Sequence, residues 1–421
     1  MTTHTRFRPV LNPHLKGFAC IRYPVEHVFD RDSSVGDDGF GCPFCLAAGL
    51  PASVSLLYDD SKLDFSLIAK DNPASGSSHY WPLLAYSGAP TRGEGNTPLV
   101  ELFSLSSEIG VGRLYLIQFG AEPTGSHKDL MTPQAVARGL ALGRKVVTCA
   151  SSGNAGASMV TYAAAAGQEA VIFATPKMNA LWAAHIRSAG ARLIVCQSAN
   201  ERWFRMGEMV KRGEAYPVTN FLKPPVGSNP FGVEAYATAA WRSLRQLAIG
   251  DGASAGALRV PDWVIVPTAR GDLLWGMWRG FLRAHAAGLI TSLPRMVAAE
   301  PLMRLEAVLV HGADYRQNFQ GPPHLMSSIG GETATLQSEL ALRQSNGLAV
   351  TVSTEQALAA FNLLCHFEGI FLELSSAAAL AALQILRERA VIGPGHTVLL
   401  AGTSHGYKEP PGVEVPVASL T

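Results

Sequence analysis

From about residue 110 onward, short runs of β-branched residues alternate with longer alanine-rich segments. This alternation is typical of β-α units that build a mostly parallel sheet. The first strands are predicted at 113–119, 145–150, 169–175 and 192–196. The helices between them are predicted at 154–167 and 178–190, and each ends on a glycine, as helix C-termini often do. Together these elements predict one compact α/β unit.

A second series of elements follows the loop at 222–230, where Pro, Gly and Asn interrupt the pattern. Its helices are predicted at 231–248, 272–288, 354–368 and 376–391. Its strands are predicted at 263–268, 295–300 and 397–403. Between 302 and 350 the pattern predicts only a helix at 335–345. Two α/β units with a cleft between them are the expected architecture.

Composition limits the kinds of partner. The chain has 421 residues, a length that predicts two or three domains. Its 34 Lys+Arg against 33 Asp+Glu leave a net charge of +1, so no global field favours nucleic acid or a membrane surface. No apolar stretch reaches the ~18 residues of a spanning helix, and the first residues lack the apolar segment of a secretory signal. With only six cysteines, the chain is expected in the cytoplasm, where they stay reduced.

The first 85 residues are rich in turn residues and hold the cysteines Cys20, Cys42 and Cys45. The C-x-x-C spacing of Cys42 and Cys45 is that of a zinc knuckle, in which two thiolates at a turn reach one ion. A complete site needs four ligands, and Tyr23 stands where the partner of Cys20 is expected, although His27 is near enough in sequence to replace it. We favour the interpretation without a metal, in which these cysteines are buried thiols or the remnant of a lost site.

Candidate chemistry lies in loops that follow predicted strands. Lys128 lies in the segment 122–129, directly after a strand and at the start of a helix, where open α/β sheets bind ligands. A second loop, at 151–156, also joins a strand to a helix. Its Ser and Gly residues leave backbone N–H groups uncovered at the helix start, which suits a carboxylate.

Two later loops complete the set. The loop at 267–273 opens a long helix whose amides and dipole favour a phosphate, and the loop at 401–406 ends the last strand with hydroxyl groups. A lysine, a carboxylate pocket, a phosphate cradle and a hydroxyl partner describe a site for pyridoxal 5'-phosphate. In such a site Lys128 holds the aldehyde as a Schiff base and the ring acts as an electron sink.

The same loops carry a family resemblance. The motifs GEGNTPL (93–99), PTGSHKD (123–129), SSGNAGAS (151–158), EGIFLELSSAAALAAL (368–383) and AGTSHGYKEP (401–410) resemble those of threonine synthase and, more broadly, of the tryptophan-synthase-like, fold type II pyridoxal-phosphate enzymes. The resemblance implies an α/β fold of two open-sheet domains with the cofactor in the cleft, a turn-rich N-terminal extension and a homodimer. We assign 1–88 to the extension, 89–145 with 226–421 to the large cofactor-binding domain, and 146–225 to the small domain.

The resemblance also implies a role for each matching residue. Lys128 is the catalytic lysine, which holds the cofactor and later carries a proton between substrate carbons. Asn154 hydrogen-bonds the cofactor's 3-hydroxyl, and Thr403 lies beside the ring nitrogen, which a neutral hydroxyl leaves unprotonated. His127 either donates to the cofactor phosphate or packs beneath the ring. The phosphate is held by the loop of Thr268, Ala269, Arg270, Gly271, Asp272 and Leu273.

Substrate contacts are implied in the same way. The loop that grips the substrate carboxylate is matched by Ser151, Ser152, Gly153 and Ala155. Thr97 and Ser126 are further candidates for substrate binding. Other residues in family-like motifs or in loops expected to line the cleft are Glu94, Asn220, Ser228, Asn229, Glu234, Ser328 and Glu373.

Departures from the family pattern bear on the substrate. Threonine synthases usually have Thr after this asparagine, and an arginine in an Asn-Pro-x-Arg stretch, both for the substrate's phosphate. This chain has Ala155 and Gly232 at these positions. Each charge-assisted bond lost is worth roughly 1.5–3 kcal/mol, which weakens the case for phosphohomoserine. Because Asp272 would repel a nearby phosphate, we expect it to point away as the helix N-cap, with Arg270 or Lys177 restoring positive charge.

The leading hypothesis is a pyridoxal-phosphate lyase, similar to threonine synthase, that eliminates or replaces a β or γ substituent of a small amino-acid substrate. A β-replacing amino-acid synthase and a serine/threonine-type ammonia-lyase are alternatives within the same class. A non-catalytic protein that keeps the cofactor, or only the fold, is an alternative of another class.

Overall fold

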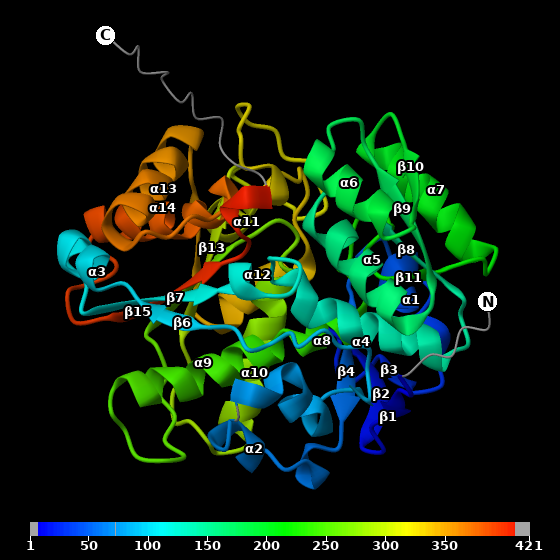
Figure 1. The fold of residues 1–421 in the computed structure, drawn as a ribbon, viewed down its shortest axis with the longest axis horizontal. Coiled ribbons are helices and arrows are strands. Elements are labelled where there is room, and N and C mark those ends of the chain that lie inside the picture. The colour runs from blue at the N-terminus through cyan, green and yellow to red at the C-terminus, as the bar shows by residue number, and fades with distance from the viewer. Residues whose placement is uncertain (1–6, 72, 409–421) are drawn as a thin grey trace.

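Two parallel sheets flanked by helices form the body of the computed structural model, which describes residues 7–71 and 73–408 (Figure 1). The larger sheet has six strands in the order β14-β13-β12-β15-β7-β6. Their bounds are β6 (Leu99–Glu101), β7 (Arg113–Gln118), β12 (Trp263–Pro267), β13 (Arg295–Glu300), β14 (Leu348–Thr351) and β15 (Thr397–Gly402). All neighbours are parallel except β6, which runs antiparallel to β7. The central strands β12 and β15 are buried throughout, as expected of a parallel sheet covered on both faces.

The smaller sheet has four parallel strands in the order β10-β9-β8-β11. Their bounds are β8 (Val146–Ala150), β9 (Glu169–Ala174), β10 (Arg192–Val195) and β11 (Tyr216–Pro217). Three helices connect them, namely α5 (Asn154–Ala166), α6 (Ala180–Ser188) and α7 (Ala199–Lys211). As predicted, α5 ends at a glycine, Gly167, in the left-handed conformation.

The strand at 113–119 does not join this unit, contrary to the prediction from the pattern. Strand β7 pairs with β15 along its whole length and with β6 on its other side, so it belongs to the six-stranded sheet. Helix α4 (Lys128–Ala141) follows β7 and leads to β8, so it carries the chain from the six-stranded to the four-stranded sheet. It packs against α5. The hydrophobic pattern identifies a buried strand correctly, but pairing depends on contacts far apart in sequence.

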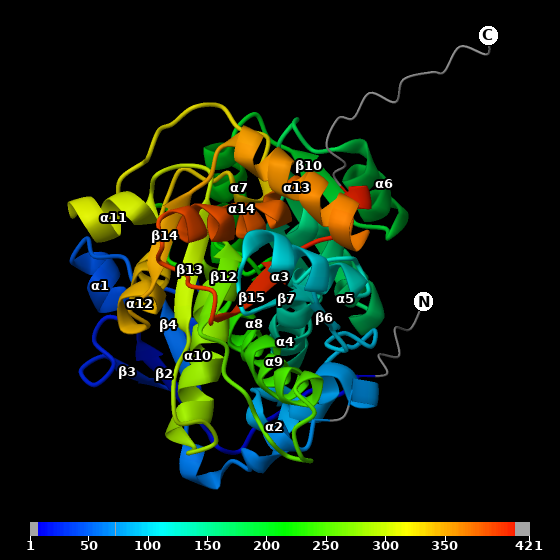
Figure 2. The same cartoon turned by 90° about the vertical axis from the view of Figure 1, so that its left-hand side faces the viewer.

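Helices cover both faces of the six-stranded sheet (Figure 2). One face is covered by α13 (Thr354–Glu368) and α14 (Leu374–Glu388), and the other by α9 (Ala237–Gly250) and α10 (Asp272–Ala286). The predicted helix at 231–248 is interrupted at Tyr236, so that a short α8 (Pro230–Ala235) precedes α9. The remaining helices are α3 (Phe103–Ile109), α11 (Leu305–His311) and α12 (Leu336–Gln344).

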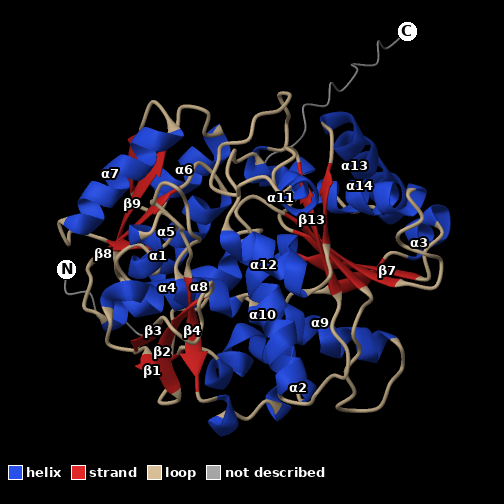
Figure 3. Ribbon diagram, turned by 180° about the vertical axis from the view of Figure 1, so that it is seen from behind, coloured by secondary structure: helices blue, strands red, loops and turns tan. Residues whose placement is uncertain are grey.

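The N-terminal extension forms a separate antiparallel sheet, apart from both parallel sheets (Figure 3). Its order is β3-β2-β4, with β2 (Leu15–Cys20), β3 (Val28–Asp30) and β4 (Val54–Tyr58). The extension also contains β1 (Val10–Leu11), β5 (Tyr86–Ser87), α1 (Pro43–Ala47) and α2 (Ser66–Ala69). The ring of Phe18 packs edge-on against Phe231 of α8 at 5.7 Å, and the indole N–H of Trp275 in α10 donates to Ser55 at 3.2 Å. The extension therefore packs against the helices of the large sheet.

Within the described ranges, none of the helices combines the length and the apolar character needed to span a bilayer.

Candidate active site

Lys128 is the first residue of α4, the helix that connects β7 of the six-stranded sheet to β8 of the four-stranded sheet. Its amine donates to the hydroxyl of Tyr236 at 3.3 Å, and no ion pair to it occurs among the described residues. Burial lowers the pKa of Lys128, and Arg270 lowers it further, whereas the carboxylates of Asp272 and Glu373 partly offset this shift. A lysine with a depressed pKa has more of the neutral amine that reacts with an aldehyde or accepts a proton.

His127 holds the chain just before this lysine against the last strand. Its Nδ1 and its backbone N–H both lie 3.0 Å from the carbonyl oxygen of Thr403. A carbonyl only accepts, so Nδ1 carries the proton. Burial, together with the positive charge of Lys128, lowers the pKa of His127 well below its usual range. The neutral ring packs between Phe119 at 6.1 Å and Tyr236 at 5.7 Å, with Nε2 unprotonated and unable to donate.

Glu373 joins the two sheets through a buried network. Its carboxylate accepts hydrogen bonds from the amide of Asn154 at 3.1 Å, from Ser328 at 3.2 Å and from Thr403 at 3.4 Å. Asn154 begins α5 on the four-stranded sheet, and Ser404 at the end of β15 donates to its Oδ1 at 3.3 Å. Asn154 and Thr403, predicted from separate loops, are thus brought together. From the sequence, Glu373 was predicted only as one of the residues near the cleft, because its position just before α14 does not reveal these contacts.

The loop before α5 presents the amides predicted to bind a carboxylate. Gly153 is the N-cap residue, and its N–H donates to the hydroxyl of Ser151 at 3.2 Å. The N–H groups of Asn154 and Ala155, the first two helical residues, have no partner within the helix. The hydroxyl of Ser152 points away, toward Thr175 at 3.1 Å.

The loop before α10 has the conformation of a phosphate cradle. Gly271 is the N-cap with φ 77°, and a Cβ at this position would collide with Ser338. The N–H groups that open α10, at Asp272 and Leu273, have no partner within the helix, which suits them to bind an anion. Thr268 turns its own hydroxyl back to the carbonyl of Val266 at 2.7 Å, so the loop offers its backbone.

Asp272 is not the helix N-cap, contrary to expectation. Its carboxylate instead accepts from the N–H and the hydroxyl of Ser228, at 3.0 and 2.7 Å, and from the amide of Gln337 at 2.7 Å. Although burial raises it, the nearby Lys128, Ser228 and Arg270 bring the pKa of Asp272 below its usual value. The carboxylate is therefore turned into the protein and held there.

Two arginines, Arg202 and Arg270, lie beside these loops and have no directly ion-paired carboxylate among the described residues. Arg202 of α7 donates to Ser152 at 3.3 Å, and the guanidinium of Arg270 lies 5.4 Å from the ring centre of Trp203. No ion pair to either arginine occurs among the described residues. Burial, and next the charge of Arg270, lowers the pKa of Arg202 to about 10. Lys177, the other cation suggested for this role, is exposed.

Arg202 was not predicted as a site residue from the sequence, because the helix that carries it was not among the predicted elements.

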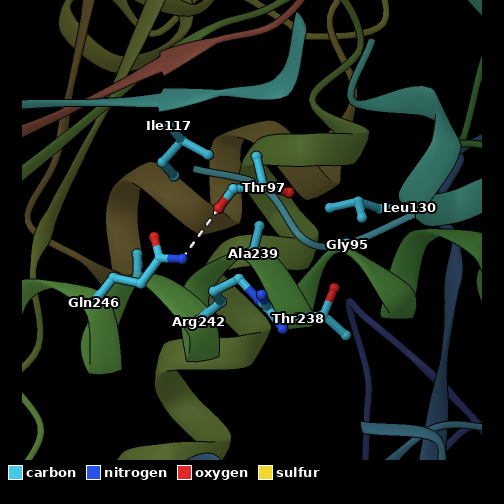
Figure 4. A pocket seen from close by; sticks show the side chains of 9 residues that line it. Gly95, Thr97, Ile117, Leu130, Thr238, Ala239, Arg242 and Gln246 are labelled. Carbon is cyan, nitrogen blue, oxygen red and sulfur yellow. Dashed lines mark hydrogen bonds between the residues drawn. The ribbon is translucent and has the colours of Figure 1, made fainter. Parts of the chain in front are cut away.

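The remaining predicted substrate residues, Thr97 and Ser126, are both buried. Thr97 donates to the carboxylate of Glu122, whose pKa burial raises to about 7. Ser126 is fully buried, and its hydroxyl has no partner among the described residues. A cavity of about 10 Å³ beside Thr97 and Gln246 is about large enough for one water molecule and is too small for a substrate (Figure 4).

Gly232 offers no substrate contact. A Cβ at this position would lie 2.9 Å from the backbone carbonyl of Met131 in α4, so there is no room for an arginine. Its neighbour Asn229 caps α8 through the N–H groups of Phe231 and Gly232, at 3.1 and 3.4 Å. Glu234 forms a buried ion pair with Arg283 at 3.0 Å. These positions hold the fold together.

The donor set fits pyridoxal phosphate. An amine of lowered pKa suits the aldehyde, unpaired helix amides and the unpartnered Nε of Arg270 suit the phosphate, and the amide of Asn154 suits a ring hydroxyl. The fold and this set of donors define a pyridoxal-phosphate enzyme of the open-sheet type. In agreement, residues 90–403 match the family of pyridoxal-phosphate dependent enzymes. The chain belongs to that family, and its cofactor is pyridoxal phosphate.

Individual relatives are more specific. The chain is 30% identical over 339 residues to the threonine synthase of Methanocaldococcus jannaschii, covering 79% of each chain. It is 29% identical over 405 residues to the threonine synthase of Methanosarcina acetivorans, covering 94% of this chain and 92% of the relative. Among solved structures, the processed form of threonine deaminase isoform 2 from Solanum lycopersicum has a TM-score of 0.60 at 16% identity, covering 73% of this chain and 79% of that one.

Proposed function

We propose that this enzyme eliminates or replaces a phosphate-bearing substituent at the β or γ carbon of an amino acid, as a threonine synthase does. The support is the pair Arg202 and Arg270, two partly buried guanidinium groups that form no ion pair among the described residues, although the charge of Asp272 favours the charged form of Arg270. Two guanidinium charges partly removed from water without a directly paired carboxylate are costly unless an anion binds between or beside them. The cofactor supplies one phosphate, and a phosphorylated substrate would supply a second.

Each residue of the site would have a separate role in the reaction. When bound, pyridoxal phosphate supplies an electron sink that acidifies the α-proton of an amino acid. Lys128 would hold the cofactor, and its amine of lowered pKa would take up and return the proton. The first amides of α5 would orient the substrate carboxylate. Glu373 fixes the amide of Asn154, which keeps its acceptor and donor atoms in one orientation.

The two arginines would substitute for the usual phosphate ligands. In this chain Ala155 has no hydroxyl and Gly232 has no room for a guanidinium. Arg202 reaches the carboxylate-binding loop from α7 through Ser152, and Arg270 lies at the start of α10. Arg270 also lies over the ring of Trp203, the residue after Arg202 on α7, so the two guanidinium groups lie in the same region.

The test measures product formation from phosphohomoserine, phosphoserine, serine and threonine by assaying inorganic phosphate, 2-oxoacid and new amino acids. We expect phosphate release from a phosphorylated substrate, and Arg202→Gln should lower kcat/KM for it about 10- to 150-fold, the value of one charge-assisted bond. Arg205→Gln is the matched control, because Arg205 lies on the same helix but is exposed and paired with Glu201. Equal effects of both variants would refute the role of Arg202.

A serine/threonine-type ammonia-lyase or a β-replacing synthase is the second candidate. It is favoured by Ala155 and Gly232, which lack the usual phosphate-binding groups. Release of 2-oxoacid from unphosphorylated serine or threonine, without phosphate release from the other substrates, would support the lyase. A new amino acid formed from serine and an added nucleophile would support the synthase.

A non-catalytic protein is disfavoured because Lys128, Asn154 and Thr403 are all retained, and failure of the protein to take up the cofactor would favour it.

We also propose a cytoplasmic homodimer. Six free cysteines support a reducing compartment, and the dimer rests on the resemblance to threonine synthases. Light scattering of the purified protein tests the dimer directly.

A further inference from the structure

Three cysteines and a histidine of the N-terminal extension converge on one point. Cys20 ends β2, His27 lies in the turn before β3, and Cys42 and Cys45 flank the start of α1. One ligand atom from each residue lies within 4.8 Å of all the others. The three thiols are buried, with 0–1% of each residue exposed, and the imidazole is half-buried.

The distances between these atoms match those around a tetrahedral ion. The sulfur atoms of Cys20 and Cys45 are 3.6 Å apart, and Nδ1 of His27 lies 3.4 Å from the sulfur of Cys42 and 3.8 Å from that of Cys45. Zinc bonds of about 2.3 Å to sulfur and about 2.0 Å to nitrogen place tetrahedral ligand atoms about 3.5–3.8 Å from each other. The side chains are already spaced for a metal.

We propose that Cys20, His27, Cys42 and Cys45 bind one Zn²⁺ ion in a structural site. Thiolate and imidazole ligands select zinc over magnesium or calcium, and four protein ligands leave no open position for a substrate. On binding, the three thiols release their protons to solvent, so the centre carries one net negative charge. The spacing C-x6-H…C-x2-C differs from that of two C-x-x-C pairs, which is why the sequence alone favoured a region without metal.

The zinc site would stabilise the part of the extension that packs near the loop before α10. The N–H of Cys42 donates to the carbonyl of Ala52 at 2.8 Å, and the neighbouring Ser53 donates to Gln337 at 3.5 Å. Gln337 in turn donates to the carbonyl of Arg270 at 3.0 Å and to Asp272. Loss of the ion should therefore lower the thermal stability of the whole enzyme.

The test is to measure the metal content of the full-length holoenzyme by inductively coupled plasma mass spectrometry. The protein is purified from zinc-supplemented cells. We expect about one zinc per chain. Cys42→Ser should reduce this content to near zero, whereas Cys365→Ser, outside the cluster, should leave it unchanged. Stripping with a chelator should lower Tm, and added zinc should restore it.

Cobalt gives an independent readout that does not depend on how well Cys42→Ser folds. Uptake of Co²⁺ by the stripped wild type should produce thiolate charge-transfer bands and the intense visible bands of tetrahedral cobalt. His27→Cys should retain the metal and strengthen the charge-transfer bands, because it adds a fourth thiolate. A wild type that holds no zinc and takes up neither ion would overturn the proposal. A Cys20–Cys45 disulfide in the protein from reducing cells would overturn it too.

Discussion

Tyr236→Phe tests the origin of the reactivity of Lys128. The substitution removes the hydroxyl that accepts a hydrogen bond from the lysine amine at 3.3 Å and keeps the buried ring that packs on His127. This bond favours the charged lysine, so its loss should lower the pKa of Lys128 further. A net hydrogen bond of about 0.5–1.5 kcal/mol corresponds to a shift of about 0.4–1.1 pH units, because one unit equals 1.36 kcal/mol.

The assay is the rate at which an amine-acylating reagent modifies Lys128 in cofactor-free protein, followed by peptide mass spectrometry across pH. At a fixed pH below the pKa, the variant should react about 2- to 12-fold faster, since more of its amine is neutral. Tyr115→Phe is the control, because it removes a buried hydroxyl on β7 that interacts with Glu101 and not with Lys128. An unchanged or higher pKa in Tyr236→Phe would refute this reasoning.

Three further substitutions test the packing and charges around the site. Gly232→Ala should lower the free energy of unfolding, measured in urea, by about 1–3 kcal/mol, because its Cβ would meet the α4 backbone at 2.9 Å. The control Gly395→Ala, whose Cβ would meet nothing within 4 Å, should lower the free energy of unfolding less. Because the folded pKa of Asp272 is depressed, its stabilisation is present above about pH 4 and lost as the pH falls through the folded pKa. Asp272→Asn should therefore flatten the acid decline of wild-type stability. Asn154→Asp places a second carboxylate beside Glu373, so it should lower the free energy of unfolding by about 3 kcal/mol at neutral pH. Stability should recover as the pH falls and one of the two carboxylates becomes protonated. A loss of stability that does not depend on pH would contradict this.

Long elements with strong periodicity were predictable from the sequence. Helix α13 occupies 354–368 as predicted, with a capping box of Ser353 and Gln356 at one end and Gly369 in the left-handed conformation at the other. The strand predicted at 295–300 is also observed there. Their caps and apolar runs are local signals that do not depend on tertiary contacts.

Short elements and strand pairing were less predictable. Strands β6 and β14 have only three and four residues, too few to show a period, and they are fixed by pairing with β7 and β13. The hydrophobic pattern recognised strand β7 but grouped it with the wrong sheet, because nothing in its own residues identifies β15 as its partner. The domain bounds implied by the family resemblance, in contrast, assigned residues 89–145 to the large domain.

In the candidate site, too, local features were predictable from the sequence and long-range contacts were not. Lys128 and the loops before α5 and α10 were predictable, because each follows a strand and starts a helix. The contact between Asn154 and Glu373 joins positions 219 residues apart, and no local spacing reveals it. The convergence of His27 with the cysteines likewise depends on the antiparallel sheet of the extension.

The attachment of the cofactor to Lys128 is the central claim, and chemical reduction tests it most directly. The holoenzyme is treated with borohydride, digested, and searched by mass spectrometry for a lysine that carries the reduced cofactor. We expect the modification on Lys128, its absence in Lys128→Ala, and its persistence in Lys177→Ala. A modified lysine elsewhere in the wild type, or none in protein saturated with cofactor, would contradict the account.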